Sequence, residues 1–322
     1  MKDILIETKH LSKCYTSANS LWHTDRQTTK AVDDVSLAIY RGETLGIVGE
    51  SGCGKSTLGK MLVRLLEPTS GQILWEGADI TQKEERTLRQ KMQIIFQDPY
   101  SSLNPWMTLG ELVTEPAEIH QLITKAERET YAKNLLEKVG LGAYDLKRYP
   151  HQFSGGQRQR ISIARALSVR PEFILCDEPV SALDVSIQSQ ILNLLMDLQK
   201  EMDLTYAFIS HSFPVIRNLA DRVAVMYLGR IVELAPAEQF FEQPLHPYSH
   251  MLLSAVLIPD PKVKRSPAST GEAGEQDNAA NGGCAFYSRC PRRESICKQL
   301  APTLKMASDG HQVACHCYAN LS

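Results

Sequence analysis

The stretch Gly49-Glu50-Ser51-Gly52-Cys53-Gly54-Lys55-Ser56 decides the fold expected for this chain of 322 residues. It matches G-x-x-x-x-G-K-[ST], the pattern of a phosphate-binding loop. Its glycines let the backbone curl, so that its N–H groups and those opening the next helix face an anion. Lys55 adds a positive charge for nucleotide phosphates, and Ser56, followed by Thr57, offers a hydroxyl to Mg²⁺.

The residues on either side of this loop support the same interpretation. Thr44 to Val48 is a short apolar run, as expected for a buried strand. Ser56 to Leu66 reads as a helix with one apolar face, formed by Leu58, Met61, Leu62 and Leu65. A strand, the loop and a helix therefore follow one another in the order that phosphate binding requires.

Composition places the chain among globular proteins, with 43% apolar and 22% charged residues. The net charge of −2 gives no electrostatic case for a nucleic-acid partner. The longest apolar run, Met251 to Ile258, is far short of the ~20 residues of a membrane helix, and the first residues have no signal-peptide core. We expect a protein that is cytosolic or held at a membrane by a partner.

The rest of the chain alternates between strand-like and helix-like stretches. Residues 4–48 are predicted to be rich in strands, with a hairpin tip at 16–29, and a helical region is expected over 98–168. Residues 259–283 have the composition of a flexible linker. The expected organisation is a nucleotide domain at 1–258, this linker, and a short tail at 284–322. The single elements expected are strands at 4–6, 35–39, 72–75, 92–96, 173–177 and 206–210, helices at 125–139 and 187–200, and a hairpin at 223–234.

Two adjacent acidic residues complete the chemistry of a phosphate loop. Asp177 ends an apolar strand, where it can hold Mg²⁺. Glu178 follows at once and can act as a general base toward an attacking water. The competing interpretation, two acids that cap a strand end, needs no nucleotide.

The order of motifs resembles that of the ABC-type ATPases. The segment Ser154-Gly155-Gly156-Gln157 is similar to their signature element, although Phe153 stands where leucine is most common. Four further landmarks occur in the family's order, namely Tyr15, Gln97, the D-loop segment Ser181 to Asp184, and His211. The resemblance implies an α/β fold, an ABC-type P-loop core with a β-rich N-terminal subdomain and a helical insertion, together with a short Cys-rich C-terminal tail.

The resemblance also implies roles for these residues. ATP and Mg²⁺ would be bound at Gly49 to Thr57, with Tyr15 stacking on adenine and Gln97 sensing Mg²⁺. His211 would contact the γ-phosphate beside Glu178. The signature element and Asp184 would serve the ATP of a partner ATPase subunit, since a helix start is an anion site. ATP would then stabilise a closed dimer that hydrolysis releases.

Three segments further resemble the importers of oligopeptides, dipeptides and nickel, in particular the second of their two ATPase subunits. They are Gln97 to Pro105, Leu245 to Val256, and the tail with Gly283 to Phe286, Arg289 to Pro291 and His311 to Cys315. The resemblance implies a subunit peripheral to the cytoplasmic face of the inner membrane. Its partners would be a second ATPase, two transmembrane permease subunits and an extracytoplasmic binding protein, and no nucleic acid. Nickel or a metal chelate, glutathione or an opine are alternative cargoes, and an ATPase acting on DNA or ribosomes is the alternative of another class.

The chain has eight cysteines, and five of them lie between Cys284 and Cys317. Cys284, Cys290, Cys297 and Cys315 form the pattern C-x5-C-x6-C-x17-C, which suits a thiolate site for Zn²⁺ or an iron–sulfur cluster. The resemblance favours a [4Fe-4S] cluster, with Zn²⁺ as the alternative. Cys317 could replace Cys315. His311 and His316 are expected to be solvated bystanders, with ligation of zinc by either one as the alternative. A tail that senses metal or redox state and gates the ATPase is a third possibility.

Cys53 lies inside the phosphate loop, just before the helix. A thiol at a helix N-terminus commonly has a lowered pKa. The sequence therefore suggests that thiol reagents block ATP binding at Cys53 and that ATP protects it. The competing interpretation is a small side chain tolerated at an unconstrained position.

Overall fold

A computed structural model describes residues 3–17, 27–80, 85–142, 146–255 and 282–318. The chain forms two compact units, the first of residues 1–9, 36–44 and 56–209, the second of residues 10–35, 45–55 and 210–322. β1 (Ile4–Ser17) and β2 (Gln27–Tyr40) contribute residues to both units. Both strands are longer than predicted, because polar residues at their far ends hide the strand pattern. The centre of the expected hairpin tip, residues 18–26, lies outside the described residues.

The first unit contains a parallel sheet of three strands, β6 (Met92–Ile95), β7 (Phe173–Asp177) and β8 (Thr205–Ile209). Every residue of β7 and β8 is buried, so their sequences are continuous apolar runs without alternation. The sequence predicted β7 with its observed bounds and β8 within one residue. β4 (Ser70–Trp75) and β5 (Ala78–Asp79) join β1 and β2 in a four-stranded sheet of order β2-β1-β4-β5.

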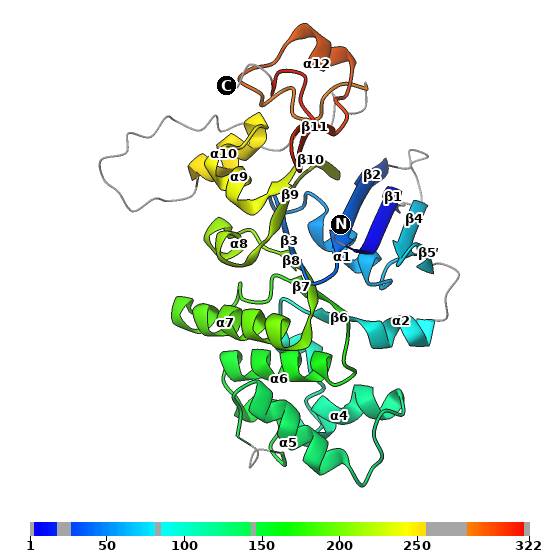
Figure 1. Cartoon of the computed structure of the whole chain (residues 1–322), viewed down its shortest axis with the longest axis vertical. Helices are drawn as coiled ribbons and strands as arrows, with labels where there is room; N and C mark the ends of the chain where they lie inside the picture. The colour runs from blue at the N-terminus through cyan, green and yellow to red at the C-terminus, as the bar shows by residue number, and fades with distance from the viewer. Residues whose placement is uncertain (1–2, 18–26, 81–84, 143–145, 256–281, 319–322) are drawn as a thin grey trace. The chain divides into compact units, whose positions relative to one another are not determined.

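The helices of the first unit follow the predicted plan, and α4, α5 and α6 lie side by side (Figure 1). One helix, α1, ends earlier than expected: Arg64 has a positive φ of 56° and Leu65 is 51% exposed, so the prediction that Leu65 faces the core was wrong. The bounds are α1 (Lys55–Leu62), α2 (Glu85–Lys91), α3 (Pro99–Ser102), α4 (Leu109–Ile119), α5 (Arg128–Lys138), η3 (Pro150–Gln152), α6 (Gly155–Leu167) and α7 (Val185–Met202).

The second unit contains β3 (Thr44–Val48), which pairs in parallel with β9 (Arg222–Tyr227). β9 and β10 (Arg230–Pro236) form the predicted hairpin, with positive φ values at Leu228 and Gly229 in its turn. The sheet continues into the Cys-rich tail, because β12 (His311–Val313) pairs with β10, and β11 (Lys305–Ser308) pairs with β12. The helices of this unit are α8 (Phe213–Leu219), α9 (Ala237–Glu242), α10 (Pro247–Ala255) and α12 (Ser295–Gln299).

The boundaries 1–258, 259–283 and 284–322 stay predictions, and nearly all of the expected linker lies outside the described residues. Among the described helices, none is both long enough and apolar enough to cross a membrane.

Candidate active site

The phosphate loop of the second unit depends on two glycines that no other residue can replace. Gly49 and Gly54 have φ values of 153° and 106°. A Cβ at Gly49 would stand 2.2 Å from the carbonyl oxygen of Met226, and a Cβ at Gly54 would stand 2.0 Å from that of Ala31. The loop therefore takes its curve only with glycine at both positions.

Lys55 lies against the curve of this loop. Its Nζ donates hydrogen bonds to the carbonyl oxygens of Gly49, at 2.8 Å, and Glu50, at 2.9 Å. The residue is 5% exposed. The ammonium group is thus held beside backbone carbonyls that could release it to a phosphate oxygen, a stronger and charged acceptor.

In the first unit, Ser56 and Asp177 form an oxygen pair suited to a divalent cation. The Ser56 hydroxyl donates to Oδ1 of Asp177 over 2.8 Å, and Asp177, at the carboxyl end of β7, is 7% exposed. A hydroxyl and a carboxylate are the kind of ligands that Mg²⁺ takes from a protein while it keeps waters and phosphate oxygens. The two residues fit the Mg²⁺ role predicted for them.

Glu178 has a backbone conformation that a glutamate rarely adopts. Its φ is 50°, its N–H donates to the Ile209 carbonyl oxygen at 3.0 Å, and its carboxylate accepts a hydrogen bond from Nε2 of Gln97 at 3.3 Å. Left-handed conformations of non-glycine residues concentrate at functional sites. Gln97 and Glu178, predicted separately, therefore lie together in this unit.

The signature element forms the start of α6 in the first unit. Ser154 caps the helix, its hydroxyl accepting from the Gln157 N–H while the Gln157 side chain accepts from the Ser154 N–H. A Cβ at Gly156 would come within 2.5 Å of Ile187, so glycine allows α6 and α7 to approach. Ser154 and the D-loop residue Asp184, which precedes α7, are exposed, as a surface for a partner would require.

The two remaining predicted residues, Tyr15 and His211, belong to the second unit. Tyr15 is 45% exposed, with the Lys13 ammonium 5.6 Å from the centre of its ring, and His211 is exposed just after the end of β8. An exposed aromatic ring can stack on a base, and the roles of Tyr15 and His211 stay predictions.

The hypothesis of a reactive thiol at Cys53 was wrong in its premise. Cys53 is 4% exposed, and burial raises its pKa, outweighing the opposing effect of Lys55. A buried, protonated thiol is a poor nucleophile.

The predicted metal ligands of the tail lie near one another. Burial, reinforced by Cys297, Cys290 and Cys315, raises the pKa of the Cys284 thiol to about 11. Even so, the described part of the chain holds no group of three or more His, Cys, Asp or Glu side chains placed to share a metal ion. The donor atoms suit a thiolate site, but their spacing in this structure is not that of a ligand shell.

His311 is not the solvated bystander that the sequence suggested. It is 3% exposed, and its Nε2 lies 2.8 Å from Oε1 of the fully buried Glu233. Glu233 also accepts from the backbone N–H groups of Leu245 and His246. The interaction secures β12 to β10, and sequence reasoning missed it because a single His has no local pattern that marks its partner.

Sequence reasoning also missed Arg289 and Tyr248, both of which contact the phosphate loop within the second unit. Arg289 forms two hydrogen bonds to the carboxylate of Glu50, and the Tyr248 hydroxyl accepts the Glu50 N–H at 2.9 Å. Arg289 is 239 residues from Glu50 in sequence, so no local signal could have paired them.

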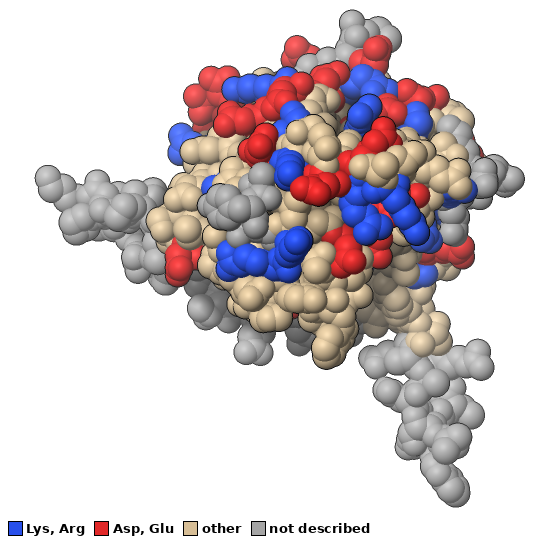
Figure 2. Space-filling view, turned by 90° about the horizontal axis from the view of Figure 1, so that it is seen from below, with Lys and Arg blue, Asp and Glu red and all other residues tan. Residues whose placement is uncertain are grey.

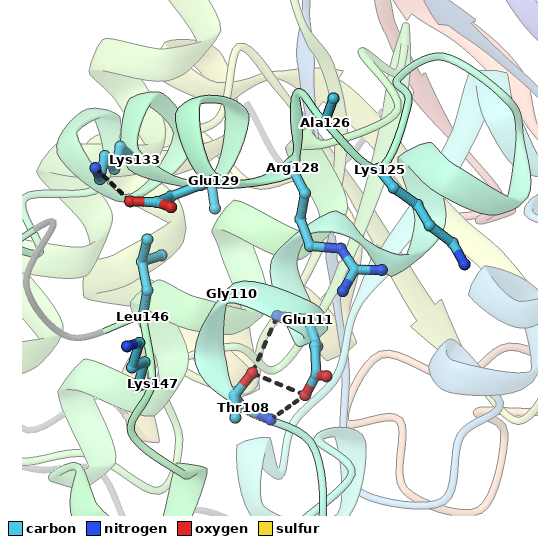
Figure 3. Close-up of a pocket in the computed structure, with 11 residues that line it drawn as sticks. Thr108, Gly110, Glu111, Lys125, Ala126, Arg128, Glu129, Lys133, Leu146 and Lys147 are labelled. Carbon is cyan, nitrogen blue, oxygen red and sulfur yellow. Dashed lines mark hydrogen bonds and ion pairs between the residues drawn. The ribbon is translucent and has the colours of Figure 1, made fainter.

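A hollow of about 960 Å³ lies elsewhere, on the helical part of the first unit (Figure 3). It is lined by α4, α5 and neighbouring loops, with Thr108, Glu111, Arg128 and Lys133 among its residues. The dashed lines in Figure 3 include the capping box of α4, which joins Thr108 and Glu111. The lining includes none of the predicted site residues.

Comparisons with known proteins agree with the class that this fold and site define, an ATP-binding cassette. The family described as ABC transporter matches residues 32–181, and the family described as oligopeptide/dipeptide transporter, C-terminal region, matches residues 232–297. The chain is similar to the solved dimer of the ATP-binding cassette MJ0796 bound to ADP and Pi, with a TM-score of 0.64 and 28% identity, covering 72% of this chain and 99% of that one.

Three relatives indicate which kind of ATP-binding cassette the chain resembles. The probable peptide ABC transporter ATP-binding protein y4tS of Sinorhizobium fredii is 48% identical, over 98% of this chain and 90% of its own length. The oligopeptide transport ATP-binding proteins AppF and OppF of Bacillus subtilis are 46% and 53% identical, over 99% and 83% of this chain and 98% and 87% of their own. The chain belongs to the family of ATP-binding proteins of oligopeptide/dipeptide ABC transporters.

Proposed function

We propose that this chain binds and hydrolyses ATP and that the hydrolysis powers the import of peptides through a membrane transporter. The observation that carries the chemistry is the arrangement at the end of β7, where Asp177 accepts from Ser56 and Glu178 accepts from Gln97. The family membership and the peptide-transport relatives support the cargo.

In the proposed reaction, water attacks the γ-phosphorus of ATP, the bond to the β,γ-bridging oxygen breaks, and ADP and phosphate leave. Glu178 accepts a proton from the water, and Gln97 and His211 orient the reacting groups. Lys55 and the loop N–H groups stabilise the phosphate charge. Ser56 and Asp177 would hold Mg²⁺, which supplies further positive charge at the β- and γ-phosphates. Tyr15 would stack on the adenine.

Replacing the proposed base tests this reaction. Glu178→Gln keeps the size of the side chain but cannot accept the proton, so we expect ATP turnover to fall at least about 100-fold. ATP binding should persist, and the closed dimer should accumulate, as measured by equilibrium binding and gel filtration with ATP. Glu238→Gln, which changes an exposed carboxylate in α9, is the control and should hydrolyse ATP normally. Normal turnover by Glu178→Gln would contradict the assignment.

The proposal includes the partners of an importer. The chain would pair with a second ATPase through Ser154 to Gln157 and Asp184, and both would dock on two permease subunits at the cytoplasmic face of the inner membrane. A binding protein outside would deliver the peptide. On the face drawn in Figure 2, described acidic and basic side chains are interspersed, which does not favour the alternative of a DNA or ribosome partner.

Purification from membranes in mild detergent tests this assembly. Recovery of the tagged chain with two permeases and a second ATPase would support it, and peptide-stimulated ATP turnover would separate peptides from nickel, metal chelates, glutathione or opines as cargo. Recovery with ribosomes or DNA and without a permease would contradict the transport proposal but leave the ATPase chemistry intact.

The tail carries a second, separate part of the proposal, a [4Fe-4S] cluster held by Cys284, Cys290, Cys297 and Cys315, with Zn²⁺ as the alternative. It is supported by the thiol chemistry of the four side chains and by a backbone hydrogen bond of 2.8 Å from the Cys284 N–H to the Cys297 carbonyl oxygen, which brings two of these residues together. Metal binding would have to draw the thiols into a ligand shell, because their spacing among the described residues is not that of one. Its role would be to stabilise the tail, and no step of ATP hydrolysis depends on it.

Metal analysis of the purified full chain, prepared without oxygen, tests the site. Four iron atoms per chain would support the cluster, and one zinc would support the alternative. Cys290→Ser should remove the metal, whereas Cys14→Ser should retain it. A chain that binds neither metal would contradict the site.

A further inference from the structure

The C-terminal segment (residues 282–318) contacts the phosphate loop at Glu50. Nη1 of Arg289 lies 2.8 Å from Oε2 of Glu50, and Nη2 lies 2.8 Å from Oε1. Both residues belong to the second unit. Two parallel hydrogen bonds between a guanidinium and a carboxylate fix orientation as well as charge.

The pair is built into its surroundings. The Arg289 side chain is only 10% exposed, and its guanidinium lies 5.8 Å from the ring centre of Tyr227 and 5.9 Å from that of Phe286. The Glu50 side chain is 32% exposed. An arginine packed beside two aromatic rings loses conformational freedom, so the contact differs from the loose ion pairs of an open surface.

Glu50 is held at its backbone as well. Its N–H donates to the hydroxyl of Tyr248, a residue of α10, and its carbonyl oxygen accepts from Nζ of Lys55. One residue of the loop thus joins the C-terminal segment on one side to the phosphate-binding ammonium group on the other.

The negative charge of Glu50 is the reason why its contact with Arg289 matters for nucleotide binding. A carboxylate in a loop that receives a polyphosphate repels the ligand and offers Lys55 a competing acceptor. Arg289 neutralises that carboxylate and occupies both of its oxygens, so that the carboxylate does not compete for Lys55. An arginine can do so without loss of charge at any physiological pH.

We propose that Arg289 is a positioning residue for nucleotide binding, which acts through Glu50 to keep the phosphate loop open to the anion and Lys55 available to it. This inference rests on the proposed ATPase function. It gives the C-terminal segment a role in nucleotide binding, and it does not depend on whether the cysteines bind a metal.

A double-mutant cycle in the full chain tests the inference. Arg289→Ala should raise the Kd and the KM for ATP about tenfold, as expected when one partner of a partly buried charge pair is removed, while kcat at saturating ATP stays within about twofold. Glu50→Gln removes the charge that needs compensation. In that background, Arg289→Ala should raise the KM by less than about twofold.

Controls separate this role from simple attachment of the tail. Arg292→Ala changes an exposed arginine of the same segment and should behave as wild type. If Arg289→Ala does not fold, Arg289→Lys, which keeps the charge but not the paired hydrogen bonds, should raise the KM about threefold alone and not in the Glu50→Gln background. A wild-type KM in the Arg289 variants, or the same loss in both backgrounds, would overturn the inference. A wild-type chain that binds no ATP would instead overturn the proposed function.

Discussion

The phosphate loop and the C-terminal segment (residues 282–318) lie in the same unit but encode their roles in different ways. In the loop, the residue types at fixed spacing mark their tasks in the sequence itself, such as the positive φ values that Gly49 and Gly54 adopt. In the C-terminal segment, the decisive residues act on distant partners, as Arg289 acts on Glu50 and His311 on Glu233. Local sequence patterns therefore predict the loop and its function, whereas the contacts of the C-terminal segment are found only in the folded chain.

The largest effect on ATP binding that this comparison predicts is the loss caused by Gly54→Ala. The added Cβ would stand 2.0 Å from the Ala31 carbonyl oxygen, so the loop must move, and a displacement of about 1 Å can cost about 100-fold in function. Isothermal titration with ATP measures it.

Gly52→Ala in the same loop provides the matched control. Gly52 has a φ of 79°, but a Cβ there would meet no described atom within 4 Å. Only backbone strain of about 1 kcal/mol is expected. Equal losses of ATP affinity in the two variants would mean that the close approach at Ala31 is not what makes the loop depend on glycine.

The largest effect on stability is predicted for Phe286→Ala, which tests whether the C-terminal segment depends on packing rather than on its cysteines. Phe286 is 2% exposed, and its ring centre lies 5.2 Å from that of Tyr227 and 5.5 Å from that of Tyr248. Truncating a buried phenylalanine costs about 3–5 kcal/mol. Hydrogen exchange at the amides of β11 and β12 should show a decrease of this size in the free energy of local opening.

Ile296→Ala is the control for this change, because Ile296 belongs to the same segment but is 43% exposed. Its effect on the same amides should be well below that of Phe286→Ala. Unchanged protection of β11 and β12 in Phe286→Ala would show that the segment is held by other means.

The sequence predicted what depends on chemistry at fixed spacing. The loop, the acidic pair after β7 and the β9–β10 hairpin are found where expected, since turn glycines and buried apolar runs leave local traces. Predictions failed where burial decided the outcome. Cys53 lies at a helix start beside a lysine, yet burial outweighs both and raises its pKa. Leu65 fits the helical period but follows the residue at which the helix has already ended.

The smallest predicted effect is a loss of stability in acid caused by His246, whose ring centre lies 5.6 Å from that of Phe286 in the C-terminal segment. His246 is 2% exposed, its Nδ1 accepts the Tyr248 N–H at 3.1 Å, and burial lowers its pKa from 6.5 to about 4. The unfolded chain therefore binds a proton more readily than the folded chain between these two values, so stability must fall as the pH falls through this range. The shift corresponds to a loss of about 2 kcal/mol in the free energy of unfolding between about pH 7 and pH 5.

A matched variant isolates this contribution of His246. His246→Asn carries no titrating group, and its Oδ1 can accept the same N–H, so its stability should change less over this range. The titration of Glu233 does not contribute to the change in stability over this pH range. Burial raises the pKa of Glu233, but hydrogen bonds from His311 and from backbone N–H groups outweigh burial and lower it below 4.5, so the stability it contributes is lost only at still lower pH. Urea unfolding of both chains across the range measures the difference. If the stability of both chains changed with pH in the same way, His246 would take up a proton as readily in the folded chain as in the unfolded one. Its buried position and its hydrogen bond to Tyr248 argue against that outcome.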